Sequence, residues 1–396
     1  MTFPARLEIP EEVLEIARTL DRAGYEAWCV GGALRDALLG DPHSDYDFAT
    51  SARPEEVQAL FRRTAAVGVK YGTVGVLDRR RVLHEVTTFR RDVATDGRRA
   101  VVEYGVALED DLARRDFTIN AIAYQPLRHE WRDPFGGAED LRRRLVRAVG
   151  EPAQRFREDY LRILRAVRFA SRFGFTIEPA TWEAARQSAS GLSQLSAERV
   201  RDEWFKSLRT ARSLPELAGL WTEVGAAAIW LPELDRDVVA ALPASSAIPP
   251  EPRDPVVLTA LLTRDPAGVL RRLRASNAEI ERAVALAAGP AEPAGSDEVA
   301  VRRWLAGVGK AADDLLSLWE LRRGSAPPWA LTVRSVRERR DPLSRSELAV
   351  TGSDLAALGA SGPRVGAILA SLLERVVEDP RLNTRDALLA LAKELL

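Results

Sequence analysis

The sequence is short of several features that mark particular classes of protein. It contains one cysteine, Cys29, which excludes an internal disulfide and a cysteine-rich zinc site. Its opening residues lack a basic segment followed by an apolar run, the pattern of a secretory signal. No run of about 18 apolar residues is present, so no membrane-spanning helix is predicted. We therefore expect a cytoplasmic protein without a membrane partner, and no protein partner is evident.

Lysine is also scarce, whereas arginine is abundant. Lysine occupies four of the 57 basic positions, so the other 53 are arginines. Coding bias is the simplest explanation for most of this excess. Between Leu141 and Arg172, however, ten arginines stand against three acidic residues, in a chain whose formal net charge is −1. A basic segment inside a neutral chain indicates a surface for phosphates, with which guanidinium groups form bidentate hydrogen bonds.

The sequence pattern changes once along the chain. A length of 396 residues, with 46% hydrophobic and 29% charged residues, fits a globular protein of about two to four domains. Up to about residue 145, short strand patterns mix with helices, and beyond about 150 apolar residues recur at helical spacing. Proline-rich breaks interrupt the helical half at 242–255, 289–295 and 325–328. We expect helices at 10–23, 33–39 and from about 53, and strands at 26–30, 73–77, 82–89 and 101–104.

The most informative stretch, residues 29–50, reads CVGGALRDALLGDPHSDYDFAT. Two glycines follow a strand pattern, and glycines let a backbone approach a phosphate closely at the start of a helix. Asp45 and Asp47 alternate along a second strand, so both carboxylates lie on one face and Tyr46 on the other. Two such carboxylates suit Mg²⁺. A phosphate-binding turn beside a metal site predicts nucleotidyl transfer, and the alternative is an exposed acidic loop.

A second stretch, residues 112–121, reads LARRDFTINA. It could be a surface helix with internal salt bridges. Alternatively, Arg115 contacts triphosphate oxygens while Asp116 and Asn120 orient that arginine or the sugar. Taken alone, this stretch does not decide between the two interpretations.

A third stretch, residues 157–169, reads REDYLRILRAVRF. Its charged residues recur every three or four positions, which predicts a single stripe along a helix: Asp159, Arg162, Arg165 and Arg168. A solvated, salt-bridged face is the usual meaning of such a pattern. Three like charges in succession fit that meaning poorly, because neighbouring arginines would repel without an anion between them. The stripe therefore favours an anion-binding surface.

Together these stretches resemble the class II tRNA nucleotidyltransferases, the CCA-adding enzymes that share a head domain with bacterial poly(A) polymerases. The matching motifs occur in the family's order: GGALRD…DYD, EVTTFRRD, DLARRDFTINA, DPFGGAEDL, REDYLRILRAVRFASRFGF and SAERVRDE. The segment LAVTGSDLAALGASGPRVGAIL resembles the tail of long bacterial members. The resemblance implies an α+β protein, with a polymerase-β-like head built on a mixed sheet and an all-helical neck, body and tail. The expected borders are 1–145 for the head, 146–212 for the neck, 213–300 for the body and 301–396 for a tRNA-binding tail.

The resemblance also implies roles for individual residues. Asp45 and Asp47 would hold Mg²⁺. Glu85 would be either a third carboxylate near the metal or an ordinary strand acid. The triphosphate or sugar would contact Gly32, Arg35 and Arg115, with Arg165 and Arg168 completing the nucleotide pocket or holding its helix.

Base choice would rest on Asp159 and Arg162. A carboxylate accepts from the exocyclic amine of cytosine or adenine, and a guanidinium donates to a ring nitrogen or carbonyl. Uracil and guanine present a carbonyl and a ring N–H instead, which would leave buried groups unpaired. CTP, ATP and tRNA are therefore the expected substrates.

Two neighbouring functions stay open at this point. A relative that adds only A, or that makes poly(A) tails, would share nearly all these motifs, and an RNA-binding protein could retain the fold without catalysis. The segment 90–99 resembles the flexible loop that helps members switch from C to A addition, and it has full length. With three histidines, none beside an aspartate, the phosphohydrolase activity of some relatives is not expected.

Overall fold

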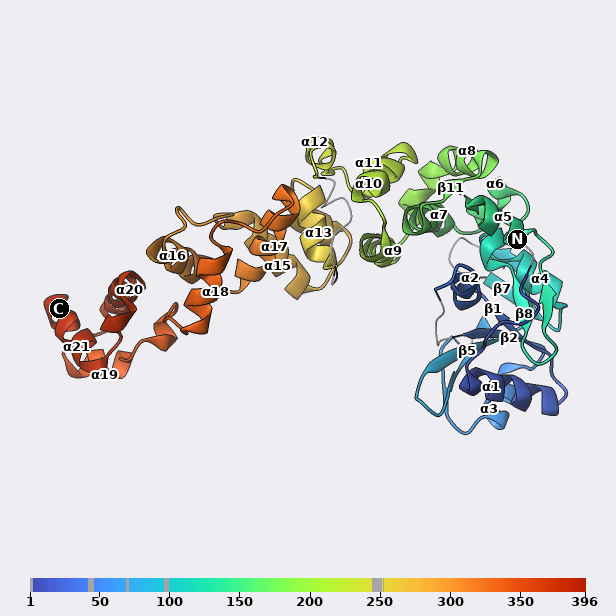
Figure 1. The fold of residues 1–396 in the computed structure, drawn as a ribbon, viewed down its shortest axis with the longest axis horizontal. Coiled ribbons are helices and arrows are strands. Elements are labelled where there is room, and N and C mark those ends of the chain that lie inside the picture. Colours follow the sequence, from blue (N-terminus) through green and yellow to red (C-terminus); the bar gives the residue numbers. More distant parts are fainter. Residues whose placement is uncertain (1–2, 42–45, 69–70, 96–99, 244–250, 252) are drawn as a thin grey trace. The chain divides into compact units, whose positions relative to one another are not determined.

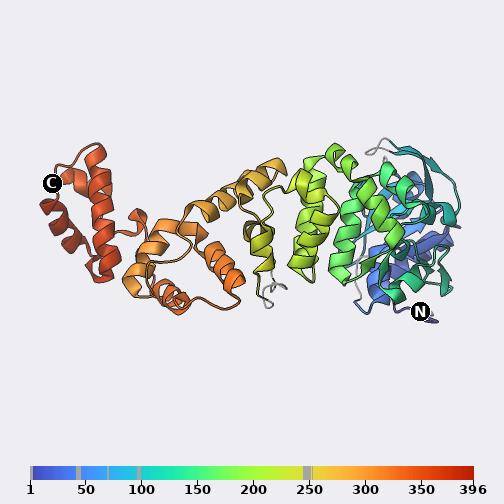
Figure 2. The same ribbon diagram turned by 90° about the horizontal axis from the view of Figure 1, so that it is seen from above.

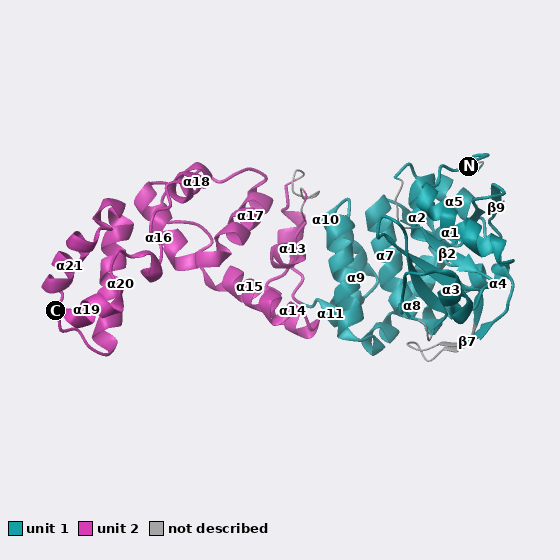
Figure 3. Ribbon diagram, turned by 90° about the horizontal axis from the view of Figure 1, so that it is seen from below, with its two compact units in different colours: residues 1–232 teal, residues 233–396 magenta. Residues whose placement is uncertain are grey.

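The computed structural model describes residues 3–396 except 42–45, 69–70, 96–99, 244–250 and 252. It divides into two compact units, Met1–Pro232 and Glu233–Leu396 (Figure 3). Among the described helices, none is both long and apolar enough to cross a bilayer. The division of the chain into head, neck, body and tail, with borders near residues 145, 212 and 300, remains a prediction.

A seven-stranded mixed sheet forms the base of unit 1. Its strand order is β3-β4-β5-β2-β1-β8-β9. β2 and β5 run parallel, and the other neighbours are antiparallel. The strands are β1 (Ala27–Val30), β2 (Asp47–Thr50), β3 (Thr64–Ala65), β4 (Thr73–Leu77), β5 (Leu83–Thr88), β8 (Ala123–Gln125) and β9 (Glu130–Arg132). The expected head with a mixed sheet is confirmed.

The two faces of the sheet carry separate apolar clusters, because side chains alternate along each strand. α1 (Glu11–Arg22) and α3 (Pro54–Leu60) cover one face, where Tyr46 and Phe48 are buried (Figure 1). The other face packs Val30 and Ala49 against α4 (Leu108–Ala113). The same alternation places Asp47 on the α4 side of the sheet.

The segment expected to be a flexible loop begins as a strand. β6 (Arg90–Thr95) pairs antiparallel with β7 (Ala100–Tyr104), with a register shift between Asp92 and Ala94. The expectation of a loop was therefore wrong for residues 90–95, because the ladder to β7 supplies their backbone hydrogen bonds. Residues 96–99 lie outside the described part of the chain.

Helices make up most of the remainder of unit 1, together with η2 (Thr118–Asn120), η3 (Ala189–Gln194) and a parallel pair of β10 (Leu145–Val146) and β11 (Thr176–Ile177). Figure 2 shows these helices, in green, beside the head. They are α5 (Gly137–Arg143), α6 (Pro152–Glu158), α7 (Leu161–Phe173), α8 (Pro179–Gln187), α9 (Ala197–Thr210), α10 (Leu214–Glu223) and α11 (Ala226–Trp230). α7 joins the head, since its Phe169 lies edge-on to Phe117 at 5.8 Å between ring centroids. α2 (Gly32–Leu38) carries the first glycine motif.

The regular elements among the described residues of unit 2 are all helices. Its α-helices are α12 (Arg236–Ala240), α13 (Pro255–Leu262), α14 (Pro266–Arg272), α15 (Asn277–Ala288), α16 (Glu298–Val308), α17 (Ala312–Arg323), α18 (Ala330–Glu338), α19 (Gly352–Ala357), α20 (Pro363–Glu378) and α21 (Arg385–Glu394). The proline-rich breaks at 289–295 and 325–328 fall between helices. Leu355, Leu372 and Leu388 belong to one apolar cluster shared by α19, α20 and α21.

Candidate active site

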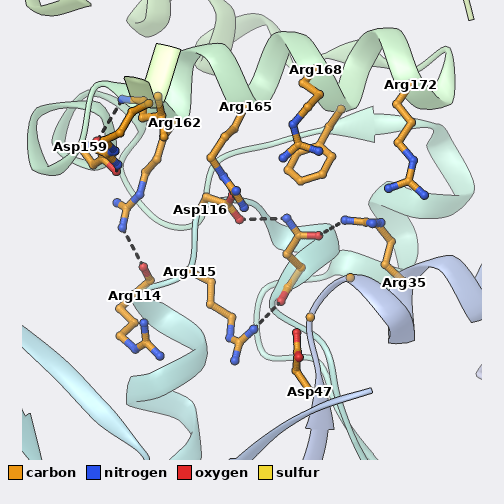
Figure 4. Close-up of a pocket in the computed structure, with 16 residues that line it drawn as sticks. Arg35, Asp47, Arg114, Arg115, Asp116, Asp159, Arg162, Arg165, Arg168 and Arg172 are labelled. Atoms are coloured by element: carbon orange, nitrogen blue, oxygen red, sulfur yellow. Dashed lines mark hydrogen bonds and ion pairs between the residues drawn. The ribbon is translucent and has the colours of Figure 1, made fainter. Parts of the chain in front are cut away.

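A pocket of about 510 Å³ in unit 1 brings together residues from all three sequence stretches (Figure 4). We call it the arginine-lined pocket, because eight arginines and three aspartates are among its described lining. Its charged and polar side chains are Arg35, Asp47, Arg114, Arg115, Asp116, Asn120, Asp159, Arg162, Arg165, Arg168, Arg172 and Arg199, and Gly31, Gly32, Leu161 and Phe169 complete it. Every predicted nucleotide-binding residue lines this pocket.

The arginines of α7 point into the pocket from successive turns of the helix (Figure 4). Arg162, Arg165 and Arg168 follow the predicted spacing, and Arg172 adds a further turn. Asp159 departs from the prediction, because it lies between the end of α6 and the start of α7 and has extended backbone angles. It accepts a hydrogen bond from the Leu161 backbone N–H at 3.1 Å, near the start of the helix.

The argument from charge repulsion was wrong. Each α7 arginine that lines the pocket is paired with a carboxylate, and most of these carboxylates come from distant parts of the chain, so no external anion is needed to relieve repulsion. The pairs are Arg162 with Glu158 at 2.6 Å, Arg165 with Asp116 at 2.6 Å, Arg168 with Glu203 at 2.6 Å and Arg172 with Asp36 at 2.8 Å. Sequence spacing along one helix could not show these partners.

Asp116 is the centre of a buried polar network. One of its carboxylate oxygens accepts from Arg165 Nε at 2.7 Å, and the other accepts from Asn120 Nδ2 at 2.9 Å. Arg35 Nη1 in turn donates to Asn120 Oδ1 at 2.6 Å. Burial alone would raise the pKa of Asp116, but the charge of Arg165 and these hydrogen bonds outweigh burial and hold the pKa at about 2. The carboxylate is therefore charged and fixed between α7 and the head.

Arg115 is oriented by a different acid from the one expected. Its Nη2 donates to Asp111 at 3.1 Å. Its Nη1 donates to the Asn120 backbone carbonyl at 3.4 Å, the contact that the dashed line from Arg115 marks in Figure 4. Its buried Nε has no hydrogen-bond partner within the part of the chain that the structure describes. The guanidinium is therefore held on one side by Asp111 and the Asn120 carbonyl while Arg115 lines the pocket.

Gly31, which the prediction passed over in favour of Gly32, lies between Asp47 and Arg115 and has a backbone conformation that favours glycine. Its φ of 82° is one that glycine adopts readily and other residues rarely do. A Cβ there would stand 3.5 Å from Asp47 Oδ2 and 3.6 Å from Arg115 Nη1, inside the space between the two side chains. Both distances are ordinary contacts, so the backbone conformation, and not crowding, favours glycine at this position.

Asp159 and Arg162 both face the pocket, but each is held by other groups. Asp159 Oδ2 accepts from Arg199 Nη2 of α9 at 2.6 Å. Arg162 donates to the backbone carbonyls of Arg114, at 3.0 Å, and Arg155, at 3.1 Å. Arg199 was missed as a site residue, although the segment SAERVRDE that contains it belongs to the resemblance. That segment was its only signal in the sequence.

Asp47 and Glu85 lie next to each other on the α4 side of the sheet. β2 and β5 pair with Phe48 opposite Val86, so the residues just before them also stand opposite each other. Both carboxylates line a second pocket of about 220 Å³ together with the hydroxyl residues Thr73 and Thr87. Asp45 lies outside the described residues. Hard oxygen donors of this kind fit a divalent cation such as Mg²⁺.

Family models match three successive parts of the chain. Residues 27–147 match the poly A polymerase head domain, residues 174–238 the RNA and SrmB-binding site of polymerase A, and residues 256–392 the tRNA nucleotidyltransferase domain 2.

Individual relatives extend this result over nearly the whole length. The CCA-adding enzyme of Lactiplantibacillus plantarum is 36% identical over 407 aligned positions, covering 99% of this chain and 97% of that protein. The CCA-adding enzyme of Geobacillus stearothermophilus is 48% identical over 213 residues, which span 52% of each chain.

A solved structure shares the fold. The crystal structure of the Bacillus stearothermophilus CCA-adding enzyme in complex with CTP superposes with a TM-score of 0.84 at 34% identity, covering 97% of this chain and 96% of that one. The fold, the arginine-lined pocket and the relatives lead to one conclusion: this chain belongs to the CCA-adding enzyme family of tRNA nucleotidyltransferases.

Proposed function

We propose that this chain adds the 3′-terminal CCA to tRNA and binds the incoming CTP or ATP in the arginine-lined pocket. The observation that carries the proposal is the convergence of guanidinium groups from α2, α7, α9 and the segment after α4 on one cavity next to Asp47. A nucleoside triphosphate is the substrate that needs many cationic donors beside a carboxylate site.

The acidic partners of these arginines support binding, although they lower the net charge of the pocket. A guanidinium has five N–H donors, and a single carboxylate on one side leaves others directed at the cavity. The pairing fixes each side chain before the nucleotide arrives, so less conformational entropy is lost on binding. Arg165 illustrates this, because Asp116 and Glu203 flank it while its side chain stays 33% exposed.

Base selection is assigned to Asp159 and Arg162 at one end of the pocket. Arg199 holds the Asp159 carboxylate, and backbone carbonyls hold the Arg162 guanidinium, so neither group depends on the base for its position. Asp159 accepts from the amine of cytosine or adenine, and Arg162 donates to the adjacent ring nitrogen or carbonyl.

The metal site is assigned to Asp47, Glu85 and the neighbouring Asp45. When bound there, Mg²⁺ would activate the primer hydroxyl and stabilise the leaving pyrophosphate. Asp47 lines both pockets, and thus connects the carboxylate pair with the place assigned to the triphosphate. Arg115, whose Nη1 lies near Gly31 as the Asp47 carboxylate does, is assigned to the triphosphate oxygens.

The remaining assignments follow from tRNA as the acceptor. The helical tail predicted over residues 301–396 would contact the RNA by recognising the shape and phosphates of the duplex, as proteins commonly do. An enzyme acting on tRNA works where tRNA is made and used, which supports a cytoplasmic location.

The decisive experiment is incubation of tRNA transcripts ending before CCA, after CC, or after CCA with each nucleoside triphosphate. The proposal requires CMP, CMP and AMP on the first transcript, AMP on the second and nothing on the third. Adenylate tails on all three would identify a poly(A) polymerase, and AMP on the second transcript without CMP on the first would identify an enzyme that adds only A. RNA binding without incorporation would identify an RNA-binding protein that retains the fold. An Asp47→Asn variant controls for contaminating activity.

A further inference from the structure

His84 is a buried histidine immediately before Glu85 on β5. It is 0% exposed, and strand alternation turns it to the face opposite Glu85, where Tyr46 and Val86 are buried. Nothing in the proposed chemistry uses it. A polar ring buried on an apolar face is costly unless its nitrogens are bonded, so its partners indicate what it does.

The stronger of its two hydrogen bonds goes to the main chain of the neighbouring strand. His84 Nδ1 lies 2.9 Å from the Tyr46 carbonyl oxygen, whereas Nε2 is 3.4 Å from Asp78 Oδ2. A carbonyl oxygen can only accept, so Nδ1 must carry the hydrogen. The short bond therefore fixes the tautomer of the ring as well as its orientation.

The position of that carbonyl gives the bond its importance. Tyr46 C=O and Asp47 N–H belong to one planar peptide unit, so holding the oxygen fixes the plane that leads into Asp47. β2 begins at Asp47, and the β2–β5 register continued backwards places Tyr46 opposite His84 and Asp47 opposite Glu85. The hydrogen bond from the His84 side chain thus ties the residue before β2, Tyr46, to β5. This bond lies next to the position where Asp47 and Glu85 stand opposite each other.

We propose that His84 is a positioning residue that fixes the Tyr46–Asp47 peptide and so keeps Asp47 beside Glu85 in the geometry a divalent cation needs. The proposal rests on the proposed function, because it takes Asp47 and Glu85 as carboxylates of the metal site. Outer partners that orient metal ligands commonly change metal affinity or activity by about 10- to 100-fold when they are removed.

Two substitutions separate the bonds of the ring. The amide nitrogen of asparagine stands near the position of Nδ1, and that of glutamine stands near Nε2. His84→Asn should therefore keep the bond to Tyr46, and His84→Gln should keep only the contact with Asp78. We expect His84→Gln to lower kcat and raise the half-saturating Mg²⁺ concentration, each by about tenfold or more, with KM for tRNA and metal-free CTP affinity unchanged. His84→Asn should restore most of both quantities.

The controls distinguish positioning from general damage. His129→Asn removes an exposed histidine elsewhere in the head and should behave like wild type. Equal losses in His84→Asn and His84→Gln, or a loss in CTP affinity that matches the loss in kcat, would overturn the proposal. If Asp47→Asn itself remains active, the proposed function fails; if Asp47→Asn is inactive while both His84 variants are normal, only the role of His84 fails.

A measurement on the wild-type protein is independent of how the variants fold. The chain has three histidines, so ¹⁵N-histidine labelling gives few signals, and the His84→Asn spectrum assigns the one from His84. If His84→Asn does not fold, spectra of His43 and His129 variants assign it by elimination. We expect a hydrogen on Nδ1 that exchanges slowly with solvent. A ring protonated on Nε2 alone would refute the proposal.

Discussion

Two buried arginine systems in this protein, one in each unit, show what separates a structural arginine from a binding arginine. Arg302 in α16 is 4% exposed, and its Nε and Nη2 donate to the backbone carbonyls of Val377 and Glu378 at 2.7 and 3.0 Å. Its Nη1 bonds Glu298 at 3.0 Å and Asp341 at 3.3 Å. All three nitrogens are thus used within the protein.

The arginines of the arginine-lined pocket are only partly used in this way. Arg165 is 33% exposed at its side chain, and its close bonds both go to one oxygen of Asp116. Arg115 is held by Asp111 and a carbonyl while its Nε stays free among the described residues. Arg302 has all three nitrogens bonded within the protein, whereas Arg165 and Arg115 line a cavity and keep donors without a close partner among the described residues, and this separates the structural arginine from the binding arginines. The same substitution should therefore have opposite consequences in the two units.

The largest expected effect is on catalysis at Asp47. Asp47→Asn removes a negative ligand from the carboxylate pair and should lower kcat by about a thousandfold or more, if metal chemistry supplies several kcal/mol at the transition state. The melting temperature should be unchanged or slightly higher, because one of two neighbouring like charges is lost. Single-turnover AMP addition to a transcript ending in CC measures the rate. Addition near the wild-type rate would contradict the assignment of Asp47.

The next largest effect is on stability at Arg302. Arg302→Ala leaves the backbone carbonyls of Val377 and Glu378 without these donors. It also removes one of the two arginines that pair with buried Asp341, while Arg339 keeps its contact at 3.0 Å. Unfolding should therefore become easier by about 2–4 kcal/mol. CTP affinity should be unchanged. Urea unfolding and CTP titration measure the two quantities. Arg115→Ala should show the opposite result, with weaker CTP binding and nearly normal stability. If both variants lost stability and CTP affinity equally, the distinction between a structural and a binding arginine would be wrong.

A smaller effect concerns base choice at Asp159. Asp159→Ala removes the acceptor for the base amine and should lower discrimination between CMP and UMP by about 1–3 kcal/mol, by analogy with base readout in nucleic-acid recognition. Competition between CTP and UTP on a transcript ending before CCA gives the ratio. An Arg199→Ala variant should shift the same ratio in the same direction, since Arg199 holds Asp159. An unaltered ratio in both would place base choice elsewhere.

The smallest effect is the pH dependence of stability at Asp116. Its pKa is lowered from 3.8 to about 2 in the folded protein, so its stabilising contribution is complete well above pH 4 and is lost as the pH falls through about 2. The full contribution is about 2 kcal/mol, and roughly half of it should be gone by pH 3. Urea unfolding of wild type and Asp116→Asn between pH 5 and pH 3 measures this loss. Parallel curves for the two proteins would show that Asp116 is not held as described.

Much of the fold and the site followed from local pattern. The strand at 73–77 was placed at its observed ends, and alternation correctly buried Tyr46 opposite the Asp47 face. The three stretches contain six of the eight arginines of the arginine-lined pocket, and Arg172 and Arg199 lie outside them. The wrong predictions also came from reading local pattern. Residues 90–95 were assigned to a loop because the neighbouring sequence does not indicate that they pair with β7.

What the sequence determined by itself was the kind of chemistry: paired carboxylates, a glycine turn and a row of arginines, all readable from spacing along single elements. Tertiary structure alone decided which charges are paired. Glu203, Asp36 and Arg199 lie in recognisable motifs, but nothing in those motifs shows that they hold Arg168, Arg172 and Asp159 in place. The physical reason is that an ion pair depends on distance in space, and the partners of these side chains are up to 136 residues away along the chain.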